Sequence, residues 1–391
     1  MRSGKKFRVS AQEVHSHASE WVSGQLGLKD HGPKCTTSVL LNILFVAAAR
    51  MCSVLAACRD LANAPSDQAV RDALFATLPA IGTLEKRLNE ALCYQIPKRL
   101  MRKARVCAMD LTLIPYHGEP EKYAKELYHS APKSGTTKFH AYATAYVTHD
   151  GFRYTLALTR VTKGEKLTKV IERLLNRVRD RGIKVKLLLL DRGFYAVDVM
   201  SYLKRTGISF LMPVVMRGRK PSAKHKAGTG LRPFLKKSSG WYAYVVGGKN
   251  KKHEAVRICV FAKYYRDKKR GKKRLKRLIY AAWGYRGNPS DTRELYRRRF
   301  GIETSYRQMN QARIRTCTRS PLLRLLYFGL ALVLRNVWVW LHYTIFADTR
   351  GEHPVLRLEL LRFRRMLHWI ESIVERLLHN GETYYVEWQL L

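Results

Sequence analysis

The pattern of apolar residues divides the chain into a helical first part, a strand-rich middle and a helical last part. Residues 1 to about 98 carry apolar positions at helical spacing, and helix-starting residues precede the apolar run from Val39. In the last part, Leu322 to Phe346 is apolar almost throughout, and Val355 to Leu378 repeats apolar residues along one side. These patterns predict all-α regions at both ends of the chain.

The middle of the chain mixes β-rich and helical segments. It contains, in order, strands at Val106 to Ile114, Phe139 to Val147 and Phe152 to Val161, a helix at Gly164 to Arg179, a strand at Val185 to Leu190, a helix at Val197 to Lys204 and a strand at Ile208 to Val215. Three antiparallel strands followed by helix–strand repeats predict an α/β (α+β) domain with a ribonuclease-H-like mixed sheet. Another mixed α/β domain is the alternative.

A very basic, strand-rich segment interrupts this domain before a long helix that starts near Pro289. We interpret the segment as an insertion that contacts DNA, although its charged turns can also be solvated loops. The resulting division is a helical N-terminal domain that binds DNA ends at 1–98, the core at 99–216 and 290–346, the basic β-rich insertion at 217–289, and a C-terminal amphipathic helix region at 347–391.

Charge indicates the kind of partner. The chain has 73 Lys and Arg against 30 Asp and Glu, a formal net charge of +43 at pH 7. Basic residues that bind phosphates release condensed counterions, so DNA or RNA is the natural partner of such a chain. A ribosomal or architectural protein would carry the same charge, so charge alone does not identify a chemistry.

Two apolar stretches resemble membrane spans, but Leu40 to Ala57 and Leu322 to Ile345 both contain Arg and Asn. Because charges at mid-membrane are costly, both are expected to be buried helices, with no membrane partner. The seven scattered cysteines form no Cys-x-x-Cys pair, which suits a reducing cytoplasm. We therefore expect a cytoplasmic protein, associated with the nucleoid in a prokaryote.

Acidic residues at strand positions indicate a candidate reaction centre. Asp110 interrupts the first apolar strand, and Asp191 follows the buried strand Val185 to Leu190. A carboxylate there costs several kcal/mol of desolvation unless a cation compensates it. Carboxylates on adjacent strands of an open sheet converge at one edge. Asp191 alone also fits a helix N-cap.

A third carboxylate comes from the long helix. Tyr296, Arg299, Glu303 and Asn310 fall within roughly 60° of one another on a helix face. Glu303 would complete a set of hard oxygen ligands suited to Mg²⁺ or Mn²⁺, while Arg299 and Tyr296 would hold a phosphate beside the cut. A surface ion pair with Arg299 or Arg307 is the alternative for Glu303 alone.

The segment Tyr296-x2-Arg299-x3-Glu303-x6-Asn310 resembles the Tyr-x2-Arg-x3-Glu-x6-Lys signature of insertion-sequence transposases of the DDE class. Asp110 and the Asp191 of Leu-Asp-Arg-Gly-Phe-Tyr resemble that family's catalytic aspartates. The long interval between Asp191 and Glu303 matches the subgroup with a β-rich insertion. Asn310 departs from the signature, so Arg307 or Arg313 is expected to take the phosphate contact of the missing Lys.

The resemblance implies a transposase that cleaves transposon ends and transfers strands into target DNA, with two metal ions held by Asp110, Asp191 and Glu303. It implies double-stranded DNA as partner and a homodimer in the synaptic complex, for which we expect the helix at 355–378 to be a subunit contact. Trp283 or Trp241 would stack on a flipped base, unless each is a core residue. A metal-dependent nuclease of the same fold and a non-catalytic nucleic-acid-binding protein are the alternatives, and a tyrosine recombinase is a remote one.

Overall fold

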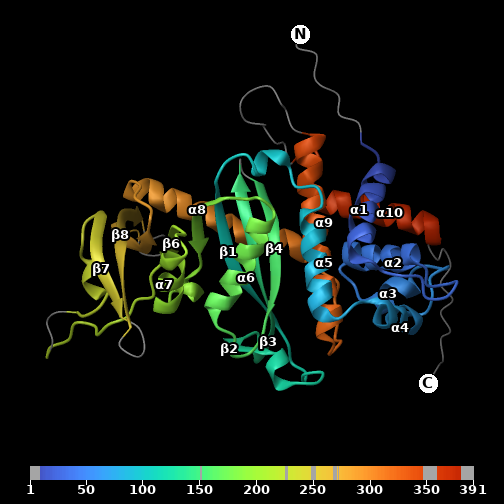
Figure 1. The fold of residues 1–391 in the computed structure, drawn as a ribbon, viewed down its shortest axis with the longest axis horizontal. Coiled ribbons are helices and arrows are strands. Elements are labelled where there is room, and N and C mark those ends of the chain that lie inside the picture. The colour runs from blue at the N-terminus through green and yellow to red at the C-terminus, as the bar shows by residue number, and fades with distance from the viewer. Residues whose placement is uncertain are drawn as a thin grey trace, which may run out of the picture.

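The computed structural model describes residues 9–149, 152–224, 228–247, 252–266, 271, 273–346 and 359–379, and for residues 99, 148, 149, 152, 298 and 300–307 the backbone alone. The sequence His149-Asp150-Gly151 is typical of a hairpin turn, and its Asp150 and Gly151 lie outside these residues. A mixed sheet occupies the middle of the molecule, helices gather at one end, and strands β7 and β8 lie at the other (Figure 1).

The sheet has the predicted ribonuclease-H-like order. Its strands are β1 (Arg105–Pro115), β2 (Tyr128–Lys133), β3 (Thr136–His149), β4 (Phe152–Val161), β5 (Val185–Leu190), β6 (Phe210–Pro213), β7 (Gly240–Gly247), β8 (His253–Arg266) and β9 (Lys273–Trp283). β1, β3 and β4 pair antiparallel, and β5 and β6 extend the sheet in parallel from β1. The fold class expected from the sequence is confirmed.

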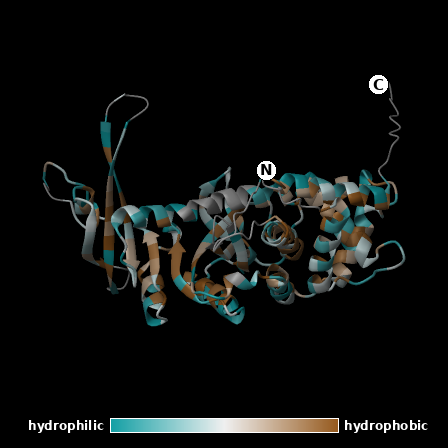
Figure 2. Ribbon diagram, turned by 90° about the horizontal axis from the view of Figure 1, so that it is seen from above, coloured by the Kyte–Doolittle hydropathy of each residue, from teal (hydrophilic) through white to brown (hydrophobic). Residues whose placement is uncertain are grey.

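The basic insertion continues this sheet. β9 pairs antiparallel with β6, so the strand order runs β2-β3-β1-β5-β6-β9-β8-β7, with β4 beside β3. β8 and β9 become exposed toward their connected ends. Figure 2 shows hydrophilic colour toward the tips of strands at the end of the sheet farthest from the helices. The insertion therefore shares the backbone hydrogen-bond network of the core and carries its charge on a projecting ribbon.

Helices pack around the sheet, both at its helical end and beside the insertion (Figure 1). They are α1 (Ala11–Leu26), α2 (Thr37–Arg50), α3 (Val54–Arg59), α4 (Asp67–Thr77), α5 (Ile81–Cys93), α6 (Leu167–Asp180), α7 (Val197–Arg205), α8 (Pro289–Met309), α9 (Pro321–Thr344) and α10 (Phe363–Leu378). Apolar side chains of α1, α2, α5, α9 and α10 join those of the sheet in one buried cluster. A single hydrophobic core therefore spans the helical end and the ribonuclease-H-like sheet.

α9 is the buried centre of the helical end. By length and composition it could cross a membrane, but 89% of its most apolar window is buried inside the protein, as the sequence predicted. Its polar Asn336 is wholly buried, and its amide donates to the carbonyls of Leu92 and Thr155 at 2.9 and 2.8 Å and accepts from the Thr155 amide. α9 is thereby tied to both α5 and β4.

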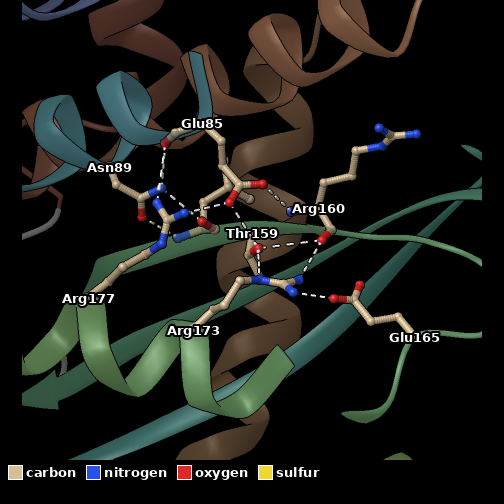
Figure 3. A network of polar contacts seen from close by, with 8 residues as sticks. Glu85, Asn89, Thr159, Arg160, Glu165, Arg173 and Arg177 are labelled. Carbon is tan, nitrogen blue, oxygen red and sulfur yellow. Dashed lines mark hydrogen bonds and ion pairs between the residues drawn. The ribbon is translucent and has the colours of Figure 1, made fainter. Parts of the chain in front are cut away.

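Polar side chains also close the open edge of β4 (Figure 3). Asn89 of α5 donates to the Leu158 carbonyl and accepts from its amide, both at 2.8 Å. Glu85 accepts from the Arg160 amide at 2.8 Å and from Arg177 of α6 at 2.6 Å. Because unpaired strand edges attract other strands, these bonds replace a neighbouring strand by the side chains of a helix.

α10 packs inside its own chain. Phe363, Leu367, Ile370 and Val374 are buried, in contact with the region of α1 and α2. Arg50 of α2 pairs with Glu371 at 2.7 Å and also with Glu375. The helix was expected to be a subunit contact because of its apolar side. Most of that side packs against the N-terminal helices of the same chain, but Leu377 is 53% exposed, and the subunit contact stays a prediction.

Candidate active site

Asp110 and Asp191 lie beside each other where β5 ends next to the middle of β1. Met109 of β1 pairs with Leu190 of β5 in the parallel ladder, so the next residue of each strand is an aspartate. The Asp110 side chain is 19% exposed and that of Asp191 43% exposed. β5 ends at Leu190, and Asp191 then caps the short turn Arg192–Phe194 by accepting from the Arg192 amide at 2.6 Å. The capping role considered for Asp191 is therefore real, and the carboxylate still faces Asp110's strand.

Arg299 of α8 lies between the two carboxylates. Its Nη2 is 3.2 Å from Asp191 Oδ1 and its Nη1 is 3.9 Å from Asp110 Oδ1, and its side chain is only 8% exposed. Burial lowers the pKa of Arg299, but Tyr296 and the two aspartates raise it, and the net shift is upward. The guanidinium is thus a fixed positive charge beside both aspartates, and it holds the two carboxylates toward one point.

Tyr296 fixes α8 against the sheet. It is 2% exposed, and its hydroxyl donates to the Leu190 carbonyl at 3.0 Å. The Arg299 guanidinium lies over its ring at 5.2 Å, and the Tyr280 ring lies 5.0 Å away on its other side. We expected Tyr296 to hold a phosphate of the DNA. Its burial and its bond to the backbone instead make it a positioning residue for Arg299.

These side chains line a cleft of about 650 Å³ that the insertion helps to build. Besides Asp110, Asp191 and Arg299, its walls include Lys276, Arg277 and Tyr280 of β9. Burial raises the pKa of Tyr280 to about 12. The basic insertion was expected to contact DNA, but the sequence did not place these β9 residues in the cleft. Only the β6–β9 pairing, with Pro213 opposite Tyr280, brings them there. No spacing within β9 signals that contact.

Glu303 belongs to α8 one turn after Arg299, but its side chain and that of Arg307 lie outside the described part of the structure. Among the side chains that are described, no group of three or more His, Cys, Asp and Glu is gathered to hold a metal. Asp110 and Asp191 nevertheless supply the hard oxygen donors that Mg²⁺ or Mn²⁺ prefers. These two carboxylates fit a divalent ion, and the helix places the Glu303 backbone on the turn next to Arg299.

Two other predicted DNA-binding residues lie away from this cleft. Arg313 lines a separate pocket, at the carboxyl end of β1. Trp283 pairs with Phe210 at the start of β6, three residues from the cleft residue Tyr280, and is half-buried against the core. Trp241 donates its ring N–H to the Gly287 carbonyl at 2.7 Å. The structure therefore gives both tryptophans packing contacts and places neither in the cleft.

Comparison with known proteins agrees with this geometry. The family model described as "Transposase DDE domain" matches residues 101–336. The chain is also similar in structure to the piggyBac transposase, solved by cryo-EM as a synaptic complex with hairpin DNA. The two are 11% identical, the match covers 95% of this chain and 80% of the other, and the TM-score is 0.50. A search of curated proteins finds no match.

Proposed function

This chain belongs to the transposase DDE domain family, and we propose that it cleaves the ends of a transposable DNA element and joins them to target DNA. Asp110, Asp191 and Glu303 are the proposed metal ligands and catalytic residues. The observation that carries this proposal is the convergence of Asp110 and Asp191 from adjacent strands, bridged by Arg299.

The chain's own residues prepare the site for in-line displacement at phosphorus. Two divalent ions, when bound, would activate the attacking water or 3′-hydroxyl and stabilise the leaving oxygen. Asp110 and Asp191 would bind those ions, and Arg299 keeps the two carboxylates oriented. Lys276 and Arg277, on the cleft wall, supply positive charge for a DNA strand that enters between β9 and α8.

Substitution of the proposed ligands tests the catalytic role. We expect Asp110→Asn, Asp191→Asn and Glu303→Gln each to lower Mg²⁺-dependent cleavage of a duplex that carries the element's terminal repeat by about 10³-fold or more, which is about 4 kcal/mol. Binding of the same duplex without metal should persist, because these residues are not its charge contacts. Undiminished cleavage by any one variant would remove that residue from the ligand set.

A joining assay distinguishes a transposase from a nuclease of the same fold. A pre-cut terminal-repeat duplex with a free 3′-hydroxyl is incubated with a supercoiled plasmid and Mg²⁺, with the Asp110→Asn variant as control. We expect covalent joined products with the wild-type chain alone. Cleavage without joining would indicate the nuclease, and binding with neither activity would indicate a non-catalytic DNA-binding protein. Light scattering of the DNA complex measures whether a homodimer forms, which stays a prediction.

A further inference from the structure

A second pocket lies at the far end of the strand that carries Asp110. It has a volume of about 560 Å³ and is lined by the end of β1, by β3, by residues 313–319 and by α9. Its basic members are Arg313, Arg315, Arg319 and Arg324, and its walls include the rings of His140 and Tyr142. None of the side chains that line it is a carboxylate.

The strand register connects this pocket to the catalytic cleft. Asp110 lies opposite Thr144, Thr112 opposite Tyr142, and Ile114 opposite His140. Alternate residues of a strand point to one face, and directly opposite residues share that face. His140 and Tyr142 therefore lie on the same sheet face as Asp110. Four residues of strand separate Asp110 from Ile114, about 13 Å.

Among the described residues, none of the pocket arginines forms an ion pair with a carboxylate. Arg324 is 9% exposed, and its guanidinium donates to the carbonyls of Thr318 at 2.7 Å and Thr316 at 3.4 Å. Burial lowers the pKa of both Arg313 and Arg324. The charge of Arg315 further lowers the pKa of Arg313, and the charge of Arg313 further lowers that of Arg324. The Glu119 carboxylate is paired with Lys138 at 2.7 Å, and Lys138 and, less strongly, the charge of Arg319 lower its pKa. Partly buried cations without a counter-charge favour an anionic ligand.

His140 adds an uncharged polar group to the wall. It is 3% exposed, and among the described residues its Nε2 has no hydrogen-bond partner. Its ring meets Tyr116 edge-on at 4.9 Å, and the Arg324 guanidinium lies over the same Tyr116 ring at 4.6 Å. Tyr116 thus holds both a histidine and an arginine at the pocket, and a buried nitrogen without a partner is what a ligand oxygen would satisfy.

We propose that this arginine pocket binds a backbone phosphate of the element's DNA, a few nucleotides from the phosphate that is cut. The inference rests on the proposed function, since the DNA strand must reach the catalytic cleft. A distance of about 13 Å corresponds to a rise of about four base pairs along the axis of B-form DNA. The pocket and the cleft share a sheet face, so one strand can contact both.

A phosphate-neutralisation scan tests the proposal. The terminal-repeat duplex is prepared with a single uncharged methylphosphonate at each position in turn, and its affinity for the Asp110→Asn chain is measured by fluorescence anisotropy without metal. We expect about a tenfold loss of affinity at one position within a few nucleotides of the cleavage site. In an Asp110→Asn chain that also carries Arg315→Gln and Arg319→Gln, the loss of affinity at that position should be clearly smaller, because two of the four arginines that line the pocket are gone.

Matched variants separate this result from a general loss of charge. Arg315 and Arg319 are exposed, so their replacement should leave the melting temperature unchanged. Arg179→Gln with Arg205→Gln removes the same charge from exposed positions at the ends of α6 and α7, and it should preserve the penalty at the sensitive position. The proposal is wrong if neutralising no phosphate near the cleavage site lowers the affinity. It is also wrong if the full loss of affinity persists in the Arg315/Arg319 variant. The scan does not depend on cleavage, so a wild-type chain that fails to cleave would contradict the catalytic proposal alone.

Discussion

The middle and the carboxyl end of β1 differ in the charges that surround them. At Asp110, two carboxylates of neighbouring strands share one buried guanidinium, that of Arg299. At Ile114, four arginines line a pocket whose wall contains no carboxylate. One face of a single strand thus presents a site suited to cations and, about 13 Å away, a site suited to anions.

This contrast refines what the net charge of +43 means. A uniformly basic surface would attract DNA without orienting it. Here the two aspartate carboxylates are flanked by basic walls, Lys276 and Arg277 on one side and the arginine pocket on the other. The acidic groups lie where metal ions would bind, and the basic groups lie where phosphates would bind. Together they would direct a DNA strand across the sheet.

The largest expected effect comes from the guanidinium between the aspartates. Arg299→Lys keeps the charge but loses the planar fork that reaches both carboxylates. We expect metal-dependent cleavage to fall by about 10²-fold, or about 2.7 kcal/mol, with affinity for terminal-repeat DNA within about twofold of wild type. Single-turnover cleavage with saturating DNA measures it. Arg297→Lys, an exposed residue of the same helix, is the control, and an equal loss in both variants would contradict the special place of Arg299.

A smaller effect is expected from substitutions in the arginine pocket at the carboxyl end of β1. Arg315→Gln with Arg319→Gln should reduce the slope of log affinity against log salt concentration by about 1, as expected for one lost phosphate contact. Asp110→Asn should leave the slope unchanged, because that site faces metal ions. Anisotropy titrations between about 50 and 200 mM salt measure both slopes. Equal salt slopes in all three proteins would contradict the proposed difference between the cleft at Asp110 and the arginine pocket.

The last expected effect is on stability against pH, not on activity or DNA binding. Burial, with Arg324 and Arg160 nearby, lowers the pKa of His140 to about 3, so the folded chain keeps it neutral. The unfolded chain protonates it below about pH 6.5, so stability is present above that pH and falls as pH drops toward 3. We expect wild type to lose up to about 1.4 kcal/mol per pH unit in that window relative to His140→Gln. Urea unfolding at several pH values measures the difference, and parallel curves would contradict it.

Local patterns were sufficient for the core of this fold. β5 reads as a continuous apolar run because it lies between β1 and β6, and the buried residues of α6 follow its helical period. Asp110 and Asp191 could be singled out because each is an acidic residue at or directly after an apolar strand. β2 escaped notice because nearly all of it is exposed, which leaves no alternation of apolar and polar residues.

What the sequence did not predict depends on contacts between distant segments. The pairing of β6 with β9 brings Tyr280 to the cleft, and nothing within either strand encodes that partner. The arginine pocket combines β1, β3 and α9, so Arg313 was linked to DNA without its neighbour His140. The helical spacing of α8 correctly placed Tyr296 on the side of the helix that faces the site. Spacing alone does not distinguish a residue that binds a ligand from one that packs the helix against the sheet.

The sealed edge of β4 bears on how far the chain can be taken apart. Asn89, Glu85 and Asn336 occupy backbone groups that another strand would otherwise use. A truncated protein lacking residues 1–98 would lose two of these three side chains. It would expose the unpaired edge of β4 together with apolar side chains that the N-terminal helices now cover. We expect such a fragment to self-associate. A minimal catalytic unit of this protein should therefore retain α5. For the same reason, we expect that its N-terminal region cannot be exchanged between relatives as an independent module.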